Sequence, residues 1–343
     1  MKRLTICLLV VFAFPVFAVA QEKSVRPGIN KPFSSPDVVA FVERFEREGR
    51  EVYDFRQEIV DNCRLRPGMV VADIGAGTGL FTRMLAPRVG PTGQVYAVDI
   101  SKDFVEHVTK SCQKNGWKHV KGVVCTATSA ELPDNSIDLV FICDTYHHFE
   151  FPYRTIRSIR RALRPNGSIV LVEYHREKGK STDWIMNHVR AGKETFQREI
   201  ELAGFEVAED KDFMVQSYWL RFRKADRTPS RGHTTDSIAD VKRLLTDGTA
   251  ALIDVREPGE WDGGHLREAS LVPLSEIQAG TKSDKLSKSL AIKLPKTKII
   301  YFHCRSGGRV LIATDLLKTY GYDIRPLRSG FSSLVQEGFE EAR

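Results

Sequence analysis

The chain has 343 residues, 42% of them hydrophobic and 28% charged, and its formal net charge at pH 7 is +7. This composition is ordinary for a soluble globular protein, and the length corresponds to about two domains of roughly 100–200 residues each. Beyond the N-terminus no second apolar run is long enough to span a membrane, which excludes a protein with several spans.

The first twenty residues have the charge and hydrophobicity pattern of a secretory signal peptide. Lys2 and Arg3 precede the apolar stretch 4–17, and Ala18 and Ala20 form an A-x-A cleavage pattern. A membrane anchor is the alternative, because the stretch approaches the lower limit of ~17 residues for a span. The small residues favour cleavage, so we predict signal peptide 1–20 and an exported protein, periplasmic or secreted, with no stable membrane span. If this segment is not a signal peptide, the protein is cytoplasmic.

The next part of the chain predicts an open α/β domain. Residues 21–36 are rich in Pro, Ser and Lys and are expected to be an extended lead-in, and 37–60 is expected to be a helix. Short apolar strands then alternate with helices, which predicts a doubly wound α/β sheet for the domain 37–223. The expected strands are 70–74, 94–99, 121–126, 137–144 and 168–174, followed by a hairpin of 205–208 and 217–223.

A polar stretch containing Pro229 and Gly232 interrupts this alternation and predicts a linker at 224–234. A second, smaller α/β domain is predicted over 235–343. Its expected elements are helix 238–245, strand 251–254, strand 298–303 and a helix over about 309–320.

The helix expected over 153–164 carries five arginines, which raises the question of a nucleic-acid surface. Ile156, Ile159 and Leu163 supply a buried side at helical spacing. We therefore interpret the arginines as the solvated face of an amphipathic helix and expect no nucleic-acid partner.

Five cysteines follow the predicted signal peptide: Cys63, Cys112, Cys125, Cys143 and Cys304. An odd number in an exported protein indicates at least one free thiol, for which Cys304 is the candidate. The other four lack metal-ligand spacing and lie in apolar segments. We interpret them as buried free thiols, with two disulfides as the alternative.

The sequence VVADIGAGTG at 70–79 is an apolar strand followed by a glycine-rich turn. Glycines let the backbone approach a ligand, and a helix beginning after the turn offers free N–H groups. A dinucleotide-binding turn requires G-x-G-x-x-G. Leu80 and Thr82 stand where the third glycine would fall in the two registers, so the pyrophosphate fingerprint is missing.

The observed D-x-G-x-G-x-G pattern instead resembles motif I of class I S-adenosylmethionine-dependent methyltransferases. The spans ATSAELP, RRALRPNGSIVLVEY and AGFEV are similar to the ubiquinone/menaquinone-biosynthesis and "type 11" groups of that family, over residues 37–223. The resemblance implies a Rossmann-like sheet and S-adenosyl-L-methionine as the cofactor. It also implies a methionine-binding turn made of Asp73, Gly75, Ala76, Gly77, Thr78 and Gly79.

The same resemblance assigns the nucleoside end of the cofactor. Asp99, followed by Ile100, ends the next strand, where a carboxylate suits the two ribose hydroxyls; a helix N-cap is its alternative role. Thr128 and Ser129 stand where the family usually has an acidic adenine contact, so a hydroxyl or backbone carbonyl is expected to replace it. Asp144 is also assigned to cofactor binding.

Polar residues that follow two strand ends are candidates for the methyl-acceptor side of the site. They are Tyr146, His147, His148 and Glu173. Methyl transfer from a sulfonium requires positioning, and a base only if the acceptor must lose a proton. A hydrogen-bonded structural residue is the alternative for each histidine. The adjacent His147 and His148 are expected to face different ways, and no metal site is predicted. The acceptor is expected to be an unidentified small molecule.

The sequence HCRSGGRV at 303–310 places Cys304 between a strand and a helix. Backbone N–H groups at the helix start favour a thiolate and a bound anion, and Arg305 and Arg309 add positive charge. Protein tyrosine phosphatases require Cys, five residues and then Arg. Here Val310 occupies that position and the arginine comes one residue earlier, which excludes the phosphatase spacing.

The loop of Cys, four residues and Arg resembles the active-site loop of rhodanese sulfurtransferases. LIDVRE at 252–257, WDGGHL at 261–266 and RSGF at 328–331 resemble other signatures of that family, over residues 235–343. The resemblance implies a small α/β rhodanese domain in which Cys304 takes sulfur from a sulfane donor such as thiosulfate, becomes a persulfide and passes the sulfur on. Asp254 and Arg256 are expected to hold the scaffold.

Together these patterns predict an exported bifunctional protein that combines methyl transfer and sulfur transfer. The alternative is a catalytically silent methyltransferase scaffold that binds a nucleoside-like ligand and carries a rhodanese sensor or sulfur-delivery module. The oligomeric state is not predicted.

Overall fold

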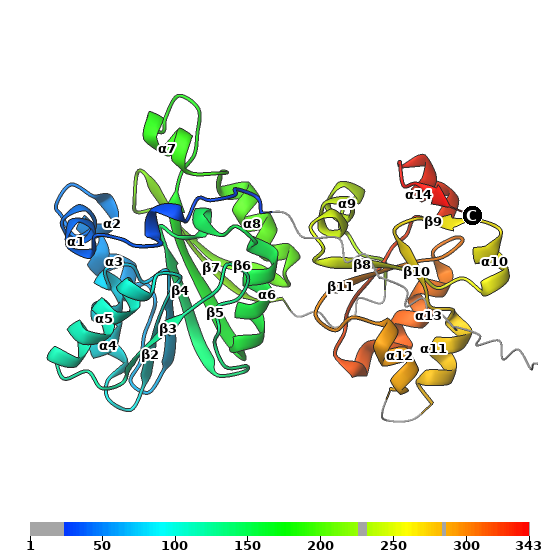
Figure 1. Cartoon of the computed structure of the whole chain (residues 1–343), viewed down its shortest axis with the longest axis horizontal. Coiled ribbons are helices and arrows are strands. Elements are labelled where there is room, and N and C mark those ends of the chain that lie inside the picture. Colours follow the sequence, from blue (N-terminus) through cyan, green and yellow to red (C-terminus); the bar gives the residue numbers. More distant parts are fainter. Residues whose placement is uncertain (1–23, 226–231, 283–285, 343) are drawn as a thin grey trace, which may run out of the picture. The chain divides into compact units, whose positions relative to one another are not determined.

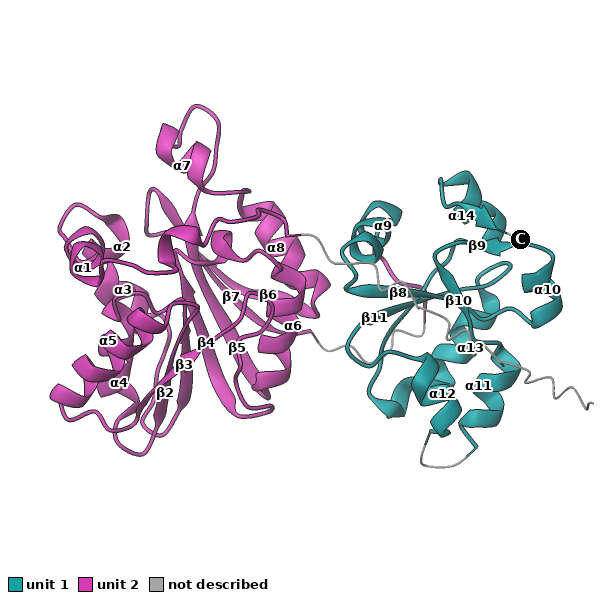
Figure 2. Cartoon of the chain, in the orientation of Figure 1, with its two compact units in different colours: residues 1–22, 237–343 teal, residues 23–236 magenta. Residues whose placement is uncertain are grey.

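A computed structural model describes residues 24–225, 232–282 and 286–342 (Figure 1). They form two compact units (Figure 2). In chain order we call them the first unit (residues 23–236, magenta, unit 2 in the key of Figure 2) and the second unit (residues 237–343, teal, unit 1 in the key). The predicted signal peptide and part of the predicted linker lie outside the described residues. Within the part of the chain that the structure describes, no helix is long and apolar enough to cross a membrane.

The first unit is built on a seven-stranded sheet in the order β3-β2-β1-β4-β5-β7-β6. The strands are β1 Val70–Ile74, β2 Gln94–Asp99, β3 Val120–Val124, β4 Ile137–Cys143, β5 Leu163–Tyr174, β6 Phe205–Lys211 and β7 Ser217–Lys224. β1 to β5 run parallel, and β7 lies antiparallel between β5 and β6. The predicted doubly wound α/β fold and its C-terminal hairpin are therefore confirmed. The strand order reverses between β1 and β4, the point where open α/β sheets bind ligands beyond their strand ends.

Apolar cores cover both faces of this sheet. The helices α4 Leu80–Val89 and α5 Lys102–Lys114 pack on one face, and α6 Pro152–Ala162 and α8 Lys193–Leu202 pack on the other (Figure 1). Strand β4 serves both cores, with Phe141 in the first and Val140 and Ile142 in the second. A strand buried on both faces has a continuous apolar sequence, which explains the run VFIC.

Three short helices occupy the region where the sequence predicted one helix over 37–60. They are α1 Val38–Phe45, α2 Glu51–Asp54 and α3 Arg56–Asp61. The prediction of a single helix is wrong because Gly49 adopts a φ of +82°, a left-handed conformation that a continuous helix does not contain.

The segment expected to be an extended lead-in contains a 3-10 helix, η1 Lys31–Phe33, and packs on the first unit. Asn30 Nδ2 donates to the His148 carbonyl at 3.0 Å, and the Phe33 ring meets the His148 ring edge-on with 5.1 Å between centroids. This segment therefore covers the loop that follows β4.

Helix α6 buries Ile156 and Ile159, as its spacing predicts. It ends at Ala162, earlier than expected, and Arg164 belongs to β5 instead. Pro165 is the physical reason for this correction, because its ring disfavours helical backbone at the residue that precedes it.

The second unit has a four-stranded parallel sheet in the order β10-β8-β11-β12. Its first elements are α9 Ile238–Thr246, β8 Ala250–Asp254, α10 Pro258–Asp262, β9 His265–Leu266, β10 Ala269–Leu271, α11 Leu274–Gly280 and α12 Lys288–Lys293. The remaining elements are β11 Ile299–His303, α13 Gly308–Leu317, η3 Lys318–Tyr320, β12 Asp323–Pro326, α14 Phe331–Gln336 and β13 Glu341–Ala342. The predicted order of helices and strands is confirmed, with α13 passing into η3 where one helix was expected.

The five cysteines of the described residues are all free thiols, as expected, and the alternative of two disulfides is not realised. Burial raises the pKa of Cys63 to about 12 and that of Cys125 to about 12. These thiols are therefore protonated at neutral pH and serve the structure as small apolar groups.

Candidate functional site

The glycine turn joins β1 to α4 at the carboxyl edge of the sheet. Gly75, Gly77 and Gly79 have φ values of +72°, +52° and +82°. A Cβ at Gly75 would lie 2.2 Å from the Thr145 side chain, whereas a Cβ at Gly77 would meet nothing nearer than 3.9 Å. The turn is therefore packed against the loop after β4 at Gly75 and is open at Gly77, where a ligand can approach the backbone.

Asp99, at the end of β2, ties this turn to the neighbouring strand. Its Oδ2 accepts a hydrogen bond from the Gly77 N–H at 2.9 Å, and its Oδ1 accepts one from the Ser101 N–H at 2.8 Å. Burial raises the pKa of Asp99, and these two N–H groups oppose the shift. The N-cap of α5 is Ser101, so the alternative N-cap role of Asp99 is not realised.

An open cavity lies beside the turn. Of the predicted cofactor-binding residues, it is lined by Gly75, Gly77, Asp99, Ile100, Ser129 and Asp144. A second, wider opening shares Gly75, Gly77 and Asp144 with this cavity and adds Ala76 and Thr78. Among the residues that line these two spaces in the described chain, Asp73, Gly79 and Thr128 do not appear.

Asp73 has a structural role at the junction of β1 and α4. Its Oδ2 accepts a hydrogen bond from the Thr82 hydroxyl of α4 at 2.6 Å, and it is almost fully buried. Burial raises the pKa of this carboxyl to about 7. The residue therefore fixes α4 against β1.

Asp144 is held in a strained position directly after β4. Its backbone has a φ of +48°, which is uncommon for a residue with a side chain. Its Oδ2 accepts hydrogen bonds from Arg50 Nη2 at 2.6 Å and from the Tyr174 hydroxyl at 3.0 Å. Burial raises the pKa of Asp144, against the opposing effect of Arg50. Tyr174 directly follows the candidate Glu173 and lines the wider opening. Sequence reasoning missed Arg50, because no local pattern connects it to this loop.

The candidate Tyr146 does not reach either space. It begins the 3-10 helix η2 Tyr146–His148, is fully buried, and donates its hydroxyl to Glu199 Oε2 at 3.0 Å. Arg190 forms an ion pair with the same carboxylate at 2.6 Å. The structure therefore corrects the assignment of Tyr146 to the acceptor side: its ring belongs to the core under α8.

His147 and Glu173 form a buried pair. The His147 Nδ1 lies 2.7 Å from Glu173 Oε1, which also accepts a hydrogen bond from the His147 backbone N–H at 3.1 Å. Glu173 Oε2 accepts a bond from the Tyr174 N–H at 3.0 Å. Glu173 is completely buried and does not line the openings, so it orients His147, which lines the wider one.

His147 and His148 face the same region, against the sequence expectation. Their ring centroids are 4.3 Å apart, and His188, the last residue of α7 Asp183–His188, lies 5.0 and 5.2 Å from them. Burial lowers the pKa of His148 to about 2 and that of His188 to about 4, so both rings are neutral at pH 7. The sequence indicated no set of metal ligands, because His188 is brought here only by the fold.

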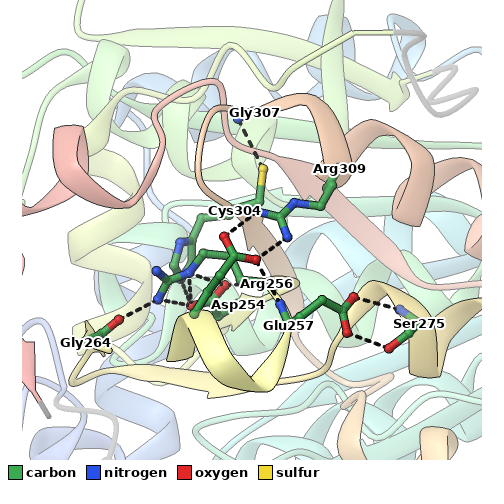
Figure 3. Close-up of polar contacts among 10 residues, drawn as sticks. Asp254, Arg256, Glu257, Gly264, Ser275, Cys304, Gly307 and Arg309 are labelled. Atoms are coloured by element: carbon green, nitrogen blue, oxygen red, sulfur yellow. Dashed lines mark hydrogen bonds and ion pairs between the residues drawn. The ribbon is translucent and has the colours of Figure 1, made fainter. Parts of the chain in front are cut away.

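Cys304 forms the centre of the second candidate site. It follows β11, and its Sγ accepts a hydrogen bond from the Gly307 N–H at 3.2 Å (Figure 3). Gly307 has a φ of +82° and is the N-cap of α13, so the sulfur lies at the positive end of a helix. Cys304 itself is 1% exposed, whereas Arg305 is exposed beside it.

Arg309 is paired with a residue that sequence reasoning missed. Its guanidinium donates to both carboxylate oxygens of Glu260 in α10, with Nη2 and Oε1 2.8 Å apart. The bond to Arg309 lowers the pKa of Glu260 to about 2. The sequence contains no pattern that indicates this pair, because Glu260 lies on another element, far from Arg309 in the sequence.

Asp254 and Arg256 support the loop as expected. Both are buried, with Arg256 Nε 2.8 Å from Asp254 Oδ2 and Arg256 Nη2 donating to the Gly264 carbonyl at 2.8 Å (Figure 3). They thereby fix the segment between β8 and β9 and do not line a surface that a substrate can reach.

Family models match both units. Residues 72–171 match the family model of a methyltransferase domain, and residues 237–337 match that of a rhodanese-like domain. The chain contains a methyltransferase domain and a rhodanese-like domain.

Curated relatives match the methyltransferase domain. The ubiquinone/menaquinone biosynthesis C-methyltransferase UbiE of Bordetella avium is 32% identical over 117 residues, which cover 34% of this chain and 45% of the relative. The uncharacterized methyltransferase YcgJ of Bacillus subtilis is 30% identical over 119 residues, which cover 35% of this chain and 46% of the relative. The chain thus spans about half the length of the curated relatives it matches.

Solved structures are also similar to part of this chain. A SAM-dependent methyltransferase from Aquifex aeolicus has 22% identity and a TM-score of 0.49, covering 53% of this chain and 96% of that one. The [4+2]-cyclase SpnF has 18% identity and a TM-score of 0.49, covering 60% of this chain and 99% of that one.

In the rhodanese-like domain, the close approach of Gly330 to the cysteine loop can be tested by substitution. A Cβ at Gly330 would lie 1.9 Å from the Arg305 carbonyl oxygen, whereas a Cβ at Gly308 would meet nothing within 4 Å. We expect Gly330→Ala to lower the free energy of unfolding of this domain by about 1–3 kcal/mol through overpacking. Denaturant unfolding measures the change, and Gly308→Ala is the control, expected within about 0.5 kcal/mol of the wild type. Equal stabilities for the two variants would contradict the close approach.

Proposed function

We propose that the methyltransferase domain binds S-adenosyl-L-methionine and transfers its methyl group to a small-molecule acceptor. The observation that carries this proposal is the joint placement of Gly77 and Asp99 on one cavity, with a hydrogen bond between them. Ribose hydroxyls are donors that suit an ionised carboxylate, and an open glycine backbone admits the methionine end. When bound, this cofactor supplies an electrophilic methyl group on a sulfonium.

The remaining walls of the cavity fit a nucleoside. Ile100 is 38% exposed and lies next to Phe104 on the wall, which provides apolar surface for a purine ring. Ser129 lines the same cavity and offers the hydroxyl that was expected to replace the family's usual acidic adenine contact, whereas Thr128 does not line the cavity. We therefore assign the adenine contact to Ser129 and remove Thr128 from it.

The acceptor side of the proposed site is the wider opening. Asp144, His147 and His148 line it together with the glycine turn. These residues bind and orient the acceptor, which is sufficient for direct displacement at a sulfonium methyl group. Asp144 also accepts a hydrogen bond from Arg50, so its carboxylate remains fixed when the acceptor enters.

Replacement of Asp99 tests the cofactor site. We expect Asp99→Ala to weaken the binding of S-adenosylmethionine and of S-adenosylhomocysteine at least tenfold, because about 1.4 kcal/mol is lost with one charged hydrogen-bond partner. Isothermal titration calorimetry on the full chain gives both affinities.

The matched control is Asp103→Ala, which removes an exposed carboxylate from α5 and should leave the affinity unchanged. A wild-type protein that binds neither ligand would refute the cofactor assignment. Binding without turnover on any acceptor would favour the silent scaffold.

We propose sulfur transfer as the function of the rhodanese-like domain. The observation in its favour is the Gly307 N–H directed at Cys304 Sγ from the start of α13, with exposed Arg305 alongside. In this step the Cys304 thiolate attacks the sulfane sulfur of thiosulfate, the S–S bond breaks, and sulfite leaves with the electron pair. Cyanide or a thiolate then attacks the outer sulfur of the persulfide, and the Cys304 thiolate is regenerated.

Thiocyanate formation from thiosulfate and cyanide tests this chemistry. We expect Cys304→Ser to abolish it, because a serine hydroxyl cannot form the persulfide. Cys125→Ser, which alters a partly buried thiol of the methyltransferase domain, should retain the wild-type rate. Turnover that persists in Cys304→Ser would remove this cysteine from the mechanism.

We propose that the protein is exported and cleaved after Ala20. The signal-like pattern of the first twenty residues supports this proposal.

Mass analysis of the protein purified from fractionated cells tests export. The expected N-terminal residue is Gln21, in the extracytoplasmic fraction, because cleavage follows the A-x-A pattern. An intact Met1 on protein from the cytoplasm would overturn the proposal.

A further inference from the structure

We propose that His147, His148 and His188 form a binding site for a divalent transition-metal ion, with Zn²⁺ as the reference ion. Each ring offers one nitrogen, and the three nitrogens all lie within 4.8 Å of one another. Two of the residues come from η2, after β4, and the third comes from the end of α7. The site is therefore assembled from two separate loops at the carboxyl edge of the sheet.

The spacing of the three nitrogens is close to that of a zinc site. Zn²⁺ binds imidazole nitrogens at about 2.0–2.1 Å in tetrahedral geometry, which puts neighbouring ligand atoms about 3.4 Å apart. The widest pair must therefore close by at most about 1.4 Å for a tetrahedral ion to bind. Imidazole is a preferred ligand of zinc, copper, nickel and iron, and neutral rings such as His148 and His188 have a lone pair to donate.

Glu173 gives His147 the outer partner that a metal ligand requires. Metal-binding histidines usually donate their second ring N–H to a carboxylate, which fixes the tautomer and the ring orientation. The Glu173 carboxylate is completely buried and lies 2.7 Å from His147 Nδ1, so Nε2 of this ring is left for the metal. Backbone N–H groups of His147 and Tyr174 hold Glu173 itself in place.

The surroundings of His148 and His188 also favour metal binding. The Nδ1 atom of His148 is buried and has no hydrogen-bond partner among the described residues, a state that is costly unless a ligand satisfies the ring. The His188 ring stacks on Trp184, with centroids 4.6 Å apart and an interplanar angle of 20°. This stacking restricts the ring to few orientations.

Some charged groups around the three histidines oppose a bound cation, and others favour it. Arg26 opposes a cation, but its guanidinium is held by the carbonyls of Asn187 and His188, and these bonds also fix the end of α7. Arg44 is a second cation near His188. Glu173 and Asp144 supply the opposing negative charge, although Asp144 is paired with Arg50. A neutral three-histidine set with one outer carboxylate is a ligand set that catalytic zinc sites use.

Three protein ligands leave a fourth position on a tetrahedral ion open. The three histidines line the wider opening, which also contains Gly75 and Gly77. The role of the ion rests on the proposed methyl transfer: at the open position it binds an oxygen, nitrogen or sulfur atom of the acceptor, orients it and lowers its pKa. Binding of the metal itself does not depend on that function.

Calorimetric titration of Zn²⁺ into the full chain tests the site. The protein carries no affinity tag, has been stripped with a chelator, and contains Cys304→Ser so that the loop thiol cannot bind metal. We expect one ion per chain with a dissociation constant of about 1 μM or below. Titration with Co²⁺ should give the visible absorption of a tetrahedral nitrogen-ligated ion.

His188→Ala should weaken Zn²⁺ binding at least about 100-fold, because it removes one of three ligands at a partly exposed position. His107→Ala, which removes a histidine of α5 outside the cluster, is the matched control and should bind Zn²⁺ like the parent. Titration of S-adenosylhomocysteine into each variant reports whether the methyltransferase domain is intact.

The outcomes separate the two proposals. Absence of Zn²⁺ binding in a protein that binds S-adenosylhomocysteine overturns the metal site and leaves the methyltransferase proposal standing. Zn²⁺ binding without S-adenosylhomocysteine binding supports the metal site and removes the role assigned to the ion. Equal Zn²⁺ affinity in His188→Ala and the parent overturns the site.

Discussion

The methyltransferase domain depends on one constraint, the hydrogen bond from the Gly77 N–H to the Asp99 carboxylate. This bond connects the loop after β1 to the end of β2, so the glycine turn and the carboxylate keep a fixed position relative to each other. Asp99 also accepts a bond from Ser101 at the start of α5, which extends the same link to a helix. One buried carboxylate thus holds three elements and still lines the cavity.

The loop after β4 packs against the glycine turn that follows β1. Thr145 occupies the space that a side chain at Gly75 would need, so the two loops pack directly against each other. Asp144, the residue before Thr145, adopts a left-handed backbone conformation in this loop. Its carboxylate accepts hydrogen bonds from Arg50 and Tyr174. Strain of this kind persists only where surrounding contacts over-determine it, and it is common at functional sites.

The fold was predictable because its strands are continuous apolar runs and its turns contain glycine, both of which are local signals. Asp99 and Cys304 were predictable from local signals too, since Asp99 ends an apolar strand and Cys304 follows one and begins a glycine-containing loop. The helix expected over 37–60 failed at Gly49, where backbone conformation overrides an apolar pattern.

Long-range partners could not be predicted. Glu260 reaches Arg309, and His188 reaches His147, only after helices have packed on the sheet, and a single sequence contains no local trace of such a meeting. Tyr146 shows the opposite error. Its place beside two histidines suggested a surface role, but a 3-10 helix turns by about 120° per residue and directs it into the core.

The two proposed sites favour ligands of opposite character. In the methyltransferase domain, buried carboxylates face the cavity and favour donors such as hydroxyl and ammonium groups. In the rhodanese-like domain, a helix start and the exposed Arg305 favour an anion at Cys304. A dianion such as thiosulfate is disfavoured beside Asp99 and Asp144, and a zwitterionic nucleoside lacks the charge that the cysteine loop favours. The electrostatics of each site would therefore allow both proposed chemistries in one chain without competition for ligands.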